Sequence, residues 1–429
     1  MIPTMTPTGY NNTGVTFLYE EFTNISLTNS TIKDNDKETY LLAYRISQYI
    51  ALYFLPILGI VGLIGNILSF IVFVTSFLSK LSSSVYLAAL AVSDSGFLIT
   101  VIIMNWLPYI NVQIIHKPAI CQITLFVSSV CGFLSVWYVV GFTVERYIAV
   151  CYPMKRNFMC TTKRAKIVVI SLGIYAIVSY SYMLWMHMVI GNQCVLIPIH
   201  IPAFSIFQYI DIFTTLIIPT LALFIMNSRI SFQIIYFFKE RKVLTQAVRT
   251  SIKKPKSWNT QDSSRLAQMK ITKMLLVVST VFLLLNLPAH AIRLQATLIQ
   301  VLKIRTGSHL ESVLQGYFQL LFYLNFGINF FLYSFCGKNF RLATTKMFRN
   351  TYHNLCQRKI RERYSLVTRW GNTNNRHDTS PPQGSSTRNT LTTESNHPQN
   401  AFNMGTMYFN GKSYSVKSHK YHRNSSELI

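Results

Sequence analysis

The sequence predicts an all-α integral membrane protein, built as a bundle of seven transmembrane helices. Half of its 429 residues are hydrophobic and only 13% are charged, which is about half the charged fraction of soluble domains. The hydrophobic residues lie in long blocks, and a helix of about 20 apolar residues can cross the hydrocarbon core of a bilayer. The predicted helices span 46–77, 83–110, 119–151, 165–189, 204–238, 269–299 and 312–335.

The segments on either side of these blocks are polar. Residues 1–44 form a tail that holds three N-glycosylation sequons, at Asn11, Asn24 and Asn29. Three sequons in one short segment indicate an extracellular glycosylated tail. Residues 351–429 have few apolar side chains, so we expect a disordered tail that cannot bury enough surface to fold alone.

The distribution of basic residues predicts the orientation. The net charge is +25, but no basic, aromatic-rich soluble module is present, so nucleic acid is not an expected partner. Lys and Arg concentrate in 152–166, in 239–273 and after 335. Because basic loops remain in the cytoplasm, the N-terminus is predicted outside and the C-terminus inside, with the basic segments against anionic membrane lipid.

Polar residues interrupt the apolar blocks, and such residues usually face the interior of a membrane bundle. The interruptions are "GN" with Asn66, "LAVSD" with Asp94, "ERYIAVCYP", "LNLP" with Asn286, and "NFGINFFLY" with Tyr333. Their order and depth across residues 45–350 resemble the rhodopsin-like (class A) G-protein-coupled receptors.

The resemblance implies a plasma-membrane receptor that binds an extracellular ligand, activates heterotrimeric G proteins and catalyses nothing. A seven-helix transporter is one alternative, but it would predict internal repeats, and none is seen in the sequence. An enzyme is a second alternative. The sequence shows no metal-binding cysteine spacing, His-rich cluster or nucleophile–base pair that would favour it.

The family's activation motif lies at the cytoplasmic end of the third predicted helix. By resemblance, Arg146 pairs with Glu145, beside Tyr147, and is released when a G protein docks. Met154 resembles the apolar residue that inserts into the G protein. An activation role also falls on two residues of the seventh helix, Asn329 and Tyr333.

The sixth helix both matches and departs from the family. Pro288 matches its kink, and Phe282 is a packing residue one turn below the usual aromatic switch. Asn286 occupies the place of that switch residue. We expect Asn286 to join the polar network around Asp94 through hydrogen bonds.

Asp94 is a lone carboxylate in the middle of the membrane and needs polar partners. The family-matched candidates are Asn66, Ser135, Asn325 and Asn329. Together they resemble the family's sodium site. A water-filled hydrogen-bond network without an ion is the alternative, and the sequence leaves both open.

Three further assignments follow from the resemblance. Cys121 and Cys194 form the disulfide that ties the third helix to the second extracellular loop. Residues 338–350 form a short amphipathic helix on the inner leaflet, and Cys356 after it is palmitoylated. Ser and Thr residues of the C-terminal tail are sites for receptor kinases and arrestin.

The ligand-binding residues are predicted from shared helix faces. The third helix has Ser128 where amine receptors carry an acid, and the seventh lacks the retinal-binding lysine of opsins. The polar set suits a short neuropeptide, as in invertebrate FMRFamide and myosuppressin-like receptors, with a non-peptide small molecule or chemosensory ligand as the alternative. Asp211 and Arg293 either contact this ligand or pair with each other. The predicted set is Asn105, Trp106, Ser128, Asp211, His290, Arg293, Gln315 and Gln319.

Overall fold

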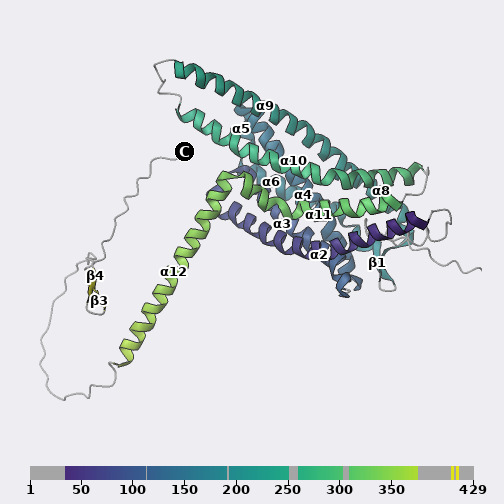
Figure 1. The fold of residues 1–429 in the computed structure, drawn as a ribbon, viewed down its shortest axis with the longest axis horizontal. Coiled ribbons are helices and arrows are strands. Elements are labelled where there is room, and N and C mark those ends of the chain that lie inside the picture. Colours follow the sequence, from purple (N-terminus) through teal and green to yellow (C-terminus); the bar gives the residue numbers. More distant parts are fainter. Residues whose placement is uncertain are drawn as a thin grey trace, which may run out of the picture. The chain divides into compact units, whose positions relative to one another are not determined.

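Seven long apolar helices dominate the computed structural model, as the sequence predicts. They pack side by side into one bundle (Figure 1). The chain divides into two compact units, Met1–Tyr352 and His353–Ile429, of which the first contains the bundle. The structure describes residues 34–112, 114–190, 193–250, 259–302, 309–374, 407–409 and 412–414.

The seven membrane segments follow the predicted order. Two of them are built from several helical pieces: the second continues through a π-helix and a 3₁₀ turn, and the fifth has a π-helix in its middle. Their bounds are α2 Asp34–Thr75, α3 Ser82–Val101 with η2 Ile102–Trp106 and η3 Leu107–Ile110, α4 Ile120–Cys151, α6 Thr162–Tyr180, α8 Ile201–Asp211 with η6 Ile212–Ile217 and α9 Ile218–Thr250, α10 Asn259–Leu302, and α11 His309–Cys336.

Short elements connect these helices, and one long helix follows them. The connections are η1 Phe77–Lys80, η4 Ile114–His116, α5 Pro153–Met159, α7 Met183–Met186, the antiparallel strands β1 His187–Ile190 and β2 Gln193–Leu196, and η5 Pro198–His200. After the bundle come α12 Lys338–Asn374 and the antiparallel strands β3 Met407–Phe409 and β4 Lys412–Tyr414.

Several predicted boundaries are wrong. The fourth membrane segment, formed by α6 and the short α7, ends at Met186 and not near 189, because the apolar residues from His187 onward form a strand. A short apolar run does not distinguish these two states. The helix predicted over 338–350 continues to Asn374. The prediction of a disordered tail therefore fails for 351–374 and for the paired strands β3 and β4.

Each π-helix ends two residues before a proline: η2 ends at Trp106, before Leu107 and Pro108, and η6 ends at Ile217, before Ile218 and Pro219. A proline has no N–H to donate, and its ring crowds the carbonyl four residues earlier, so a wider turn relieves the clash. The widening leaves backbone carbonyls without their helical donors. At η6 the indole of Trp137 from α4 donates to the carbonyl of Thr214 at 3.2 Å, which ties α4 to this turn.

Glycines allow the first and seventh membrane helices to approach each other closely. A Cβ added to Gly62 of α2 would lie 3.0 Å from the Cα of Gly327 in α11. A Cβ added to Gly65 would lie 2.9 Å from the Cβ of Phe330. Larger residues there would separate α2 from α11, and α11 carries several of the predicted site residues.

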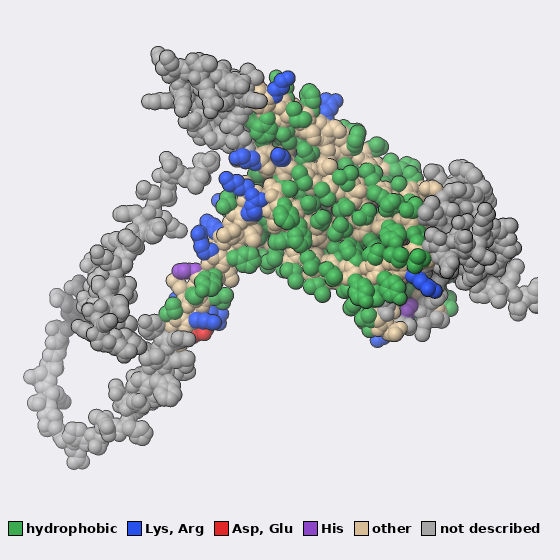
Figure 2. Space-filling model, in the orientation of Figure 1, with side chains coloured by type: hydrophobic (Ala, Val, Ile, Leu, Met, Phe, Trp, Pro, Cys, Tyr) green, Lys and Arg blue, Asp and Glu red, His purple; other side chains and the backbone are tan. Residues whose placement is uncertain are grey.

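The bundle has two distinct ends. At the end where α11 gives way to α12, the rings of Phe73, Tyr333 and Phe340 pack with centroids 5.2–5.5 Å apart. We call this end the Arg146 end, after the motif residue near the last turns of α4. The opposite end holds the Cys121–Cys194 disulfide, and we call it the disulfide end. Figure 2 shows hydrophobic side chains over the flank of the bundle and Lys and Arg side chains gathered near the start of α12.

Candidate functional site

The motif residues Glu145 and Arg146 lie buried at the end of α4. One carboxylate oxygen of Glu145 accepts hydrogen bonds from the hydroxyls of Ser82 at 2.7 Å and Ser83 at 3.1 Å. Both serines belong to the first turn of α3, where the helix dipole also favours a negative charge. The same oxygen lies 3.9 Å from Nη2 of Arg146, so the serines are its closer partners.

Arg146 is only partly satisfied in this arrangement. Its Nη2 donates to the hydroxyl of Ser83. The Nε and Nη1 atoms are buried without a hydrogen-bond partner among the described residues. Because a buried charged group without partners is costly, the guanidinium remains able to donate to an acceptor brought to this end.

The segment after α4 exposes apolar side chains beside this motif. Met154 of the short helix α5 is 92% exposed, and Phe158, one turn later, is 71% exposed. Tyr147 packs edge-on against Tyr152 with ring centroids 5.8 Å apart. Cys160 donates from its Sγ to the carbonyl of Glu145 at 3.6 Å, and burial together with Glu145 raises the pKa of this thiol.

Asp94 of α3 is fully buried in the middle of the bundle. Its two carboxylate oxygens accept one bond each, from Ser135 of α4 at 2.7 Å and from Asn329 of α11 at 2.7 Å. These bonds join three helices through one carboxylate. The structure thus brings Asp94, Ser135 and Asn329 together as the resemblance implies.

The two other members predicted for this network are buried but are placed differently. Asn66 donates to the carbonyl of Phe326 at 2.9 Å, which ties α2 to α11. Its Oδ1 has no hydrogen-bond partner among the described residues. Asn325 is 2% exposed. The hydrogen bonds of Asp94 itself come from Ser135 and Asn329.

The prediction that Asn286 bonds to the Asp94 network is wrong for this conformation. Asn286 is 4% exposed, and its amide nitrogen donates to the carbonyl of Phe282 at 2.6 Å, one turn earlier in α10. Its Oδ1 has no partner in the described part of the chain. Phe282 packs in the main core cluster, and α10 continues as a helix through Pro288.

Tyr333 of α11 is buried inside the bundle, near the Arg146 end. It is 1% exposed, and its hydroxyl has no hydrogen-bond partner among the described residues. Its neighbour Gly337 permits a tight junction between α11 and α12. A Cβ at Gly337 would lie 2.4 Å from the Sδ of Met274 in α10 and 2.5 Å from the carbonyl of Tyr333.

At the disulfide end, Asp211 has a partner that sequence reasoning missed. The hydroxyl of Tyr180, at the end of α6, donates to Oδ1 of Asp211. Arg293 is close enough to interact electrostatically with Asp211 and with His290. The ring of His290 lies edge-on to Phe322 at 5.7 Å. Asp211 therefore has a neutral donor on one side and a cation nearby.

The remaining predicted ligand residues fall into two groups. Trp106, the last residue of η2, donates from its indole to the carbonyl of Leu52 in α2 at 3.1 Å and packs against the core cluster there, which is a structural role. Asn105 donates to the carbonyl of Val101 at 3.3 Å. The other three are buried or half-buried within the bundle: Ser128, Gln315 and Gln319.

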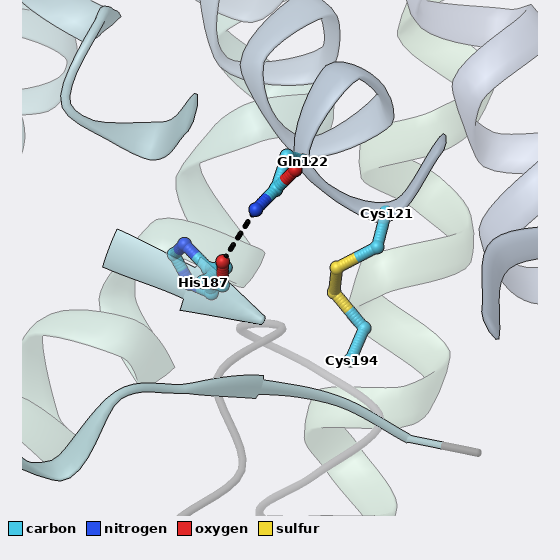
Figure 3. Close-up of a disulfide and its surroundings, with 4 residues drawn as sticks. All are labelled: Cys121, Gln122, His187 and Cys194. Atoms are coloured by element: carbon cyan, nitrogen blue, oxygen red, sulfur yellow. Dashed lines mark hydrogen bonds between the residues drawn. A yellow bond between two sulfur atoms is a disulfide. The ribbon is translucent and has the colours of Figure 1, made fainter. Parts of the chain in front are cut away.

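The predicted disulfide between Cys121 and Cys194 is present. It joins the first turn of α4 to strand β2, whose partner β1 lies across α4 (Figure 3). Gln122 adds a second link, because its side-chain amide donates to the carbonyl of His187 at 2.8 Å. Cys356 is exposed on α12, and the three sequons lie outside the described residues.

Other functional partners that the sequence reasoning missed are Ser82, Ser83 and the pair Asn227–Ser279. Ser279 of α10 donates to Oδ1 of Asn227 in α9 at 2.9 Å, and both are buried. Asn227 and Ser279 are short polar residues in apolar blocks, the same signal that identified Asp94, whereas Ser82 and Ser83 belong to a run of three serines at the start of α3. Their partners could not be predicted, since they depend on the rotation of two helices about their axes.

Comparison with known proteins gives consistent results. Residues 65–333 match the model of the 7 transmembrane receptor (rhodopsin family). The chain is 27% identical to the human thyrotropin-releasing hormone receptor over 62% of its own length and 69% of that receptor. It is 26% identical to the rat somatostatin receptor type 4 over 61% of its own length and 63% of that receptor.

The Tyr180–Asp211 contact predicts a stability effect. Tyr180→Phe leaves an oxygen of the half-buried Asp211 carboxylate without its Tyr180 donor, so we expect a loss of about 1 kcal/mol and a lower thermal midpoint for the detergent-solubilised protein. The matched control is Tyr175→Phe in the same helix, because Tyr175 is 51% exposed. Equal midpoints for the two variants would contradict the contact.

Proposed function

The chain belongs to the rhodopsin family of seven-transmembrane receptors, and we propose that it transmits the binding of an extracellular peptide to a heterotrimeric G protein. It is a multi-pass membrane receptor and not an enzyme. Its relatives include receptors named for peptide hormones: thyrotropin-releasing hormone, somatostatin and motilin. The narrower assignment to an FMRFamide or myosuppressin-like group remains a prediction.

The observation that best supports this proposal is the state of Arg146. Its side chain is 6% exposed, and its guanidinium is held by Ser83 and Glu145, with two nitrogens lacking partners in the described residues. An acceptor from a docking G protein would satisfy them. The exposed side chains of Met154 and Phe158 lie on the neighbouring helix α5 and offer apolar contact to the same partner.

We infer that the peptide binds at the disulfide end. Asp211, His290 and Arg293 provide both signs of charge and an aromatic donor there, which suits the termini and side chains of a peptide. This inference places the disulfide end outside the cell and the Arg146 end inside. Receptor kinases, arrestin and palmitoylation at the exposed Cys356 are the corresponding proposals for the C-terminal region.

The proposal is tested by screening a neuropeptide library on cells that express the chain, with calcium and cyclic-nucleotide readouts. A peptide that activates the wild type should drive nucleotide exchange on a G protein in membranes. Arg146→Ala should abolish this exchange at normal surface expression, while the exposed Arg358→Ala on α12 should not. Full exchange in Arg146→Ala would refute the role of this residue, and activation only by non-peptides would refute the ligand class.

The serine contacts of Glu145 predict constitutive activity. The double substitution Ser82→Ala and Ser83→Ala removes two hydrogen bonds to a charged group, each worth about 1.5–3 kcal/mol, from the conformation described here. Since about 1.4 kcal/mol changes an equilibrium tenfold, basal nucleotide exchange should rise several-fold or more. Ser84→Ala is the control, because Ser84 is equally buried but is not bonded to Glu145. Unchanged basal exchange in the double variant would exclude a restraining role.

We also propose that sodium binds beside Asp94. Hard cations take oxygen ligands, and the interior provides the Asp94 carboxylate, the Ser135 hydroxyl and the unpartnered Oδ1 of Asn66. Sodium would then stabilise this conformation and weaken agonist binding. Titration with sodium against potassium should shift the agonist affinity of the wild type and not of Asp94→Asn. Equal sensitivity in both proteins would favour a hydrogen-bond network without the ion.

A further inference from the structure

A histidine is buried at the first residue of the β1–β2 hairpin. His187 is 1% exposed, and neither ring nitrogen has a hydrogen-bond partner among the described residues. Its ring lies edge-on to Phe204 of α8 at 5.5 Å. Figure 3 shows the ring on one side of the Gln122 side chain and the disulfide on the other. Neither the proposed peptide binding nor G-protein activation uses this ring.

The surroundings of the ring are almost without charge. Strand β2 contributes Leu196, which pairs with His187 in the register, and α4 contributes the neutral amide of Gln122. The titratable groups on the neighbouring elements are Tyr182, before α7, His200, directly before α8, and Asp211, at the far end of α8. The interactions found for the ring in the described structure involve none of them.

Two opposing effects act on the protonation of His187. The backbone carbonyl of Met183, one turn earlier, favours the protonated ring, but burial disfavours it more strongly. The pKa of His187 is therefore lowered from its ordinary value. A neutral imidazole fits this apolar site, while an imidazolium there would be a buried charge without an anionic partner.

We propose that His187 is a proton-sensitive switch that keeps the β1–β2 hairpin closed when neutral and releases it when protonated. The hairpin is short, and in the described structure the disulfide and the Gln122 bond are its covalent and hydrogen-bonded links to α4. Opening would bring the ring to water, where the charged form is stable. With the orientation proposed above, the proton comes from the extracellular solution.

The direction of the pH effect follows from the lowered pKa. The closed hairpin binds fewer protons than the open one, so the closed form loses stability as the pH falls through the ordinary histidine pKa of about 6.5. If the closed ring stays neutral, the open fraction increases about tenfold between pH 7.5 and pH 5.5. Above pH 7.5 it should hardly change.

The disulfide provides a readout that needs neither ligand nor G protein. Cys121 is 0% exposed and Cys194 is 5% exposed, so a reductant reaches the bond mainly when the hairpin opens. The experiment treats the purified full-length receptor in detergent with tris(2-carboxyethyl)phosphine at pH 7.5 and pH 5.5. Alkylation and peptide mass spectrometry then give the rate at which these two thiols appear.

His187→Phe keeps a ring against Phe204 but cannot be protonated, and His200→Phe is the control in the neighbouring η5. Rates are expressed relative to His187→Phe at each pH, which removes the pH dependence of the reductant. This ratio should increase about tenfold on acidification for the wild type and for His200→Phe. If His187→Phe fails to fold, His187→Gln takes its place as the uncharged reference.

A ratio that is the same at both pH values would overturn the proposal, as would a loss of pH dependence in His200→Phe. Because the measurement involves no agonist, its failure leaves the proposed receptor function untouched. Conversely, a receptor that responds to no peptide could still show the pH-dependent reduction.

Discussion

Each polar side chain inside the bundle must find its partner within the protein, because the lipid around it offers none. Asp94 shows the strongest form of this constraint. Its carboxylate is fully buried and is satisfied only while α3, α4 and α11 keep the positions that bring Ser135 and Asn329 within 2.7 Å. The carboxylate thus fixes the relative placement of three helices that also carry residues at both ends of the molecule.

The same constraint explains the irregular turns. Pro108 and Pro219 each remove a backbone donor within a membrane segment, and a π-helix precedes both. At η6 the carbonyl that would otherwise remain unpaired receives the indole of Trp137. The wider turn and the indole together compensate for the missing N–H of Pro219, in the segment that follows Asp211 at the end of α8.

The sequence, with the family resemblance, was sufficient to predict the seven helices, the disulfide and the Asp94 partners Ser135 and Asn329. Long apolar blocks identify membrane helices whatever their packing, and the family's motifs indicate which polar residues meet. Tyr180 and Ser82 illustrate what the sequence could not supply. Neither residue belongs to one of the family's motifs. The partner of each depends on how the helices rotate about their axes and cross one another, and composition does not encode this. The prediction for Asn286 was wrong for the same reason, because its side-chain amide donates to the carbonyl of Phe282 in its own helix.

Several buried atoms still lack partners in the described structure, and they lie on the helices that join the two ends. Among them are Oδ1 of Asn286 in α10, the hydroxyl of Tyr333 in α11, and Nε and Nη1 of Arg146 in α4. An unpaired buried polar group costs about 1–3 kcal/mol. A second arrangement of α4, α10 and α11 that paired these atoms would recover part of that cost.

The conformation described here is held against such a rearrangement by contacts at the Arg146 end. Glu145 is fixed by two serines, and Met274 of α10 lies against Gly337 at the α11–α12 junction. The ligand that we propose at the disulfide end would therefore not need to supply the whole free energy of the change. It would have to outweigh these contacts, while pairing of the unpaired atoms in the new arrangement would contribute the rest.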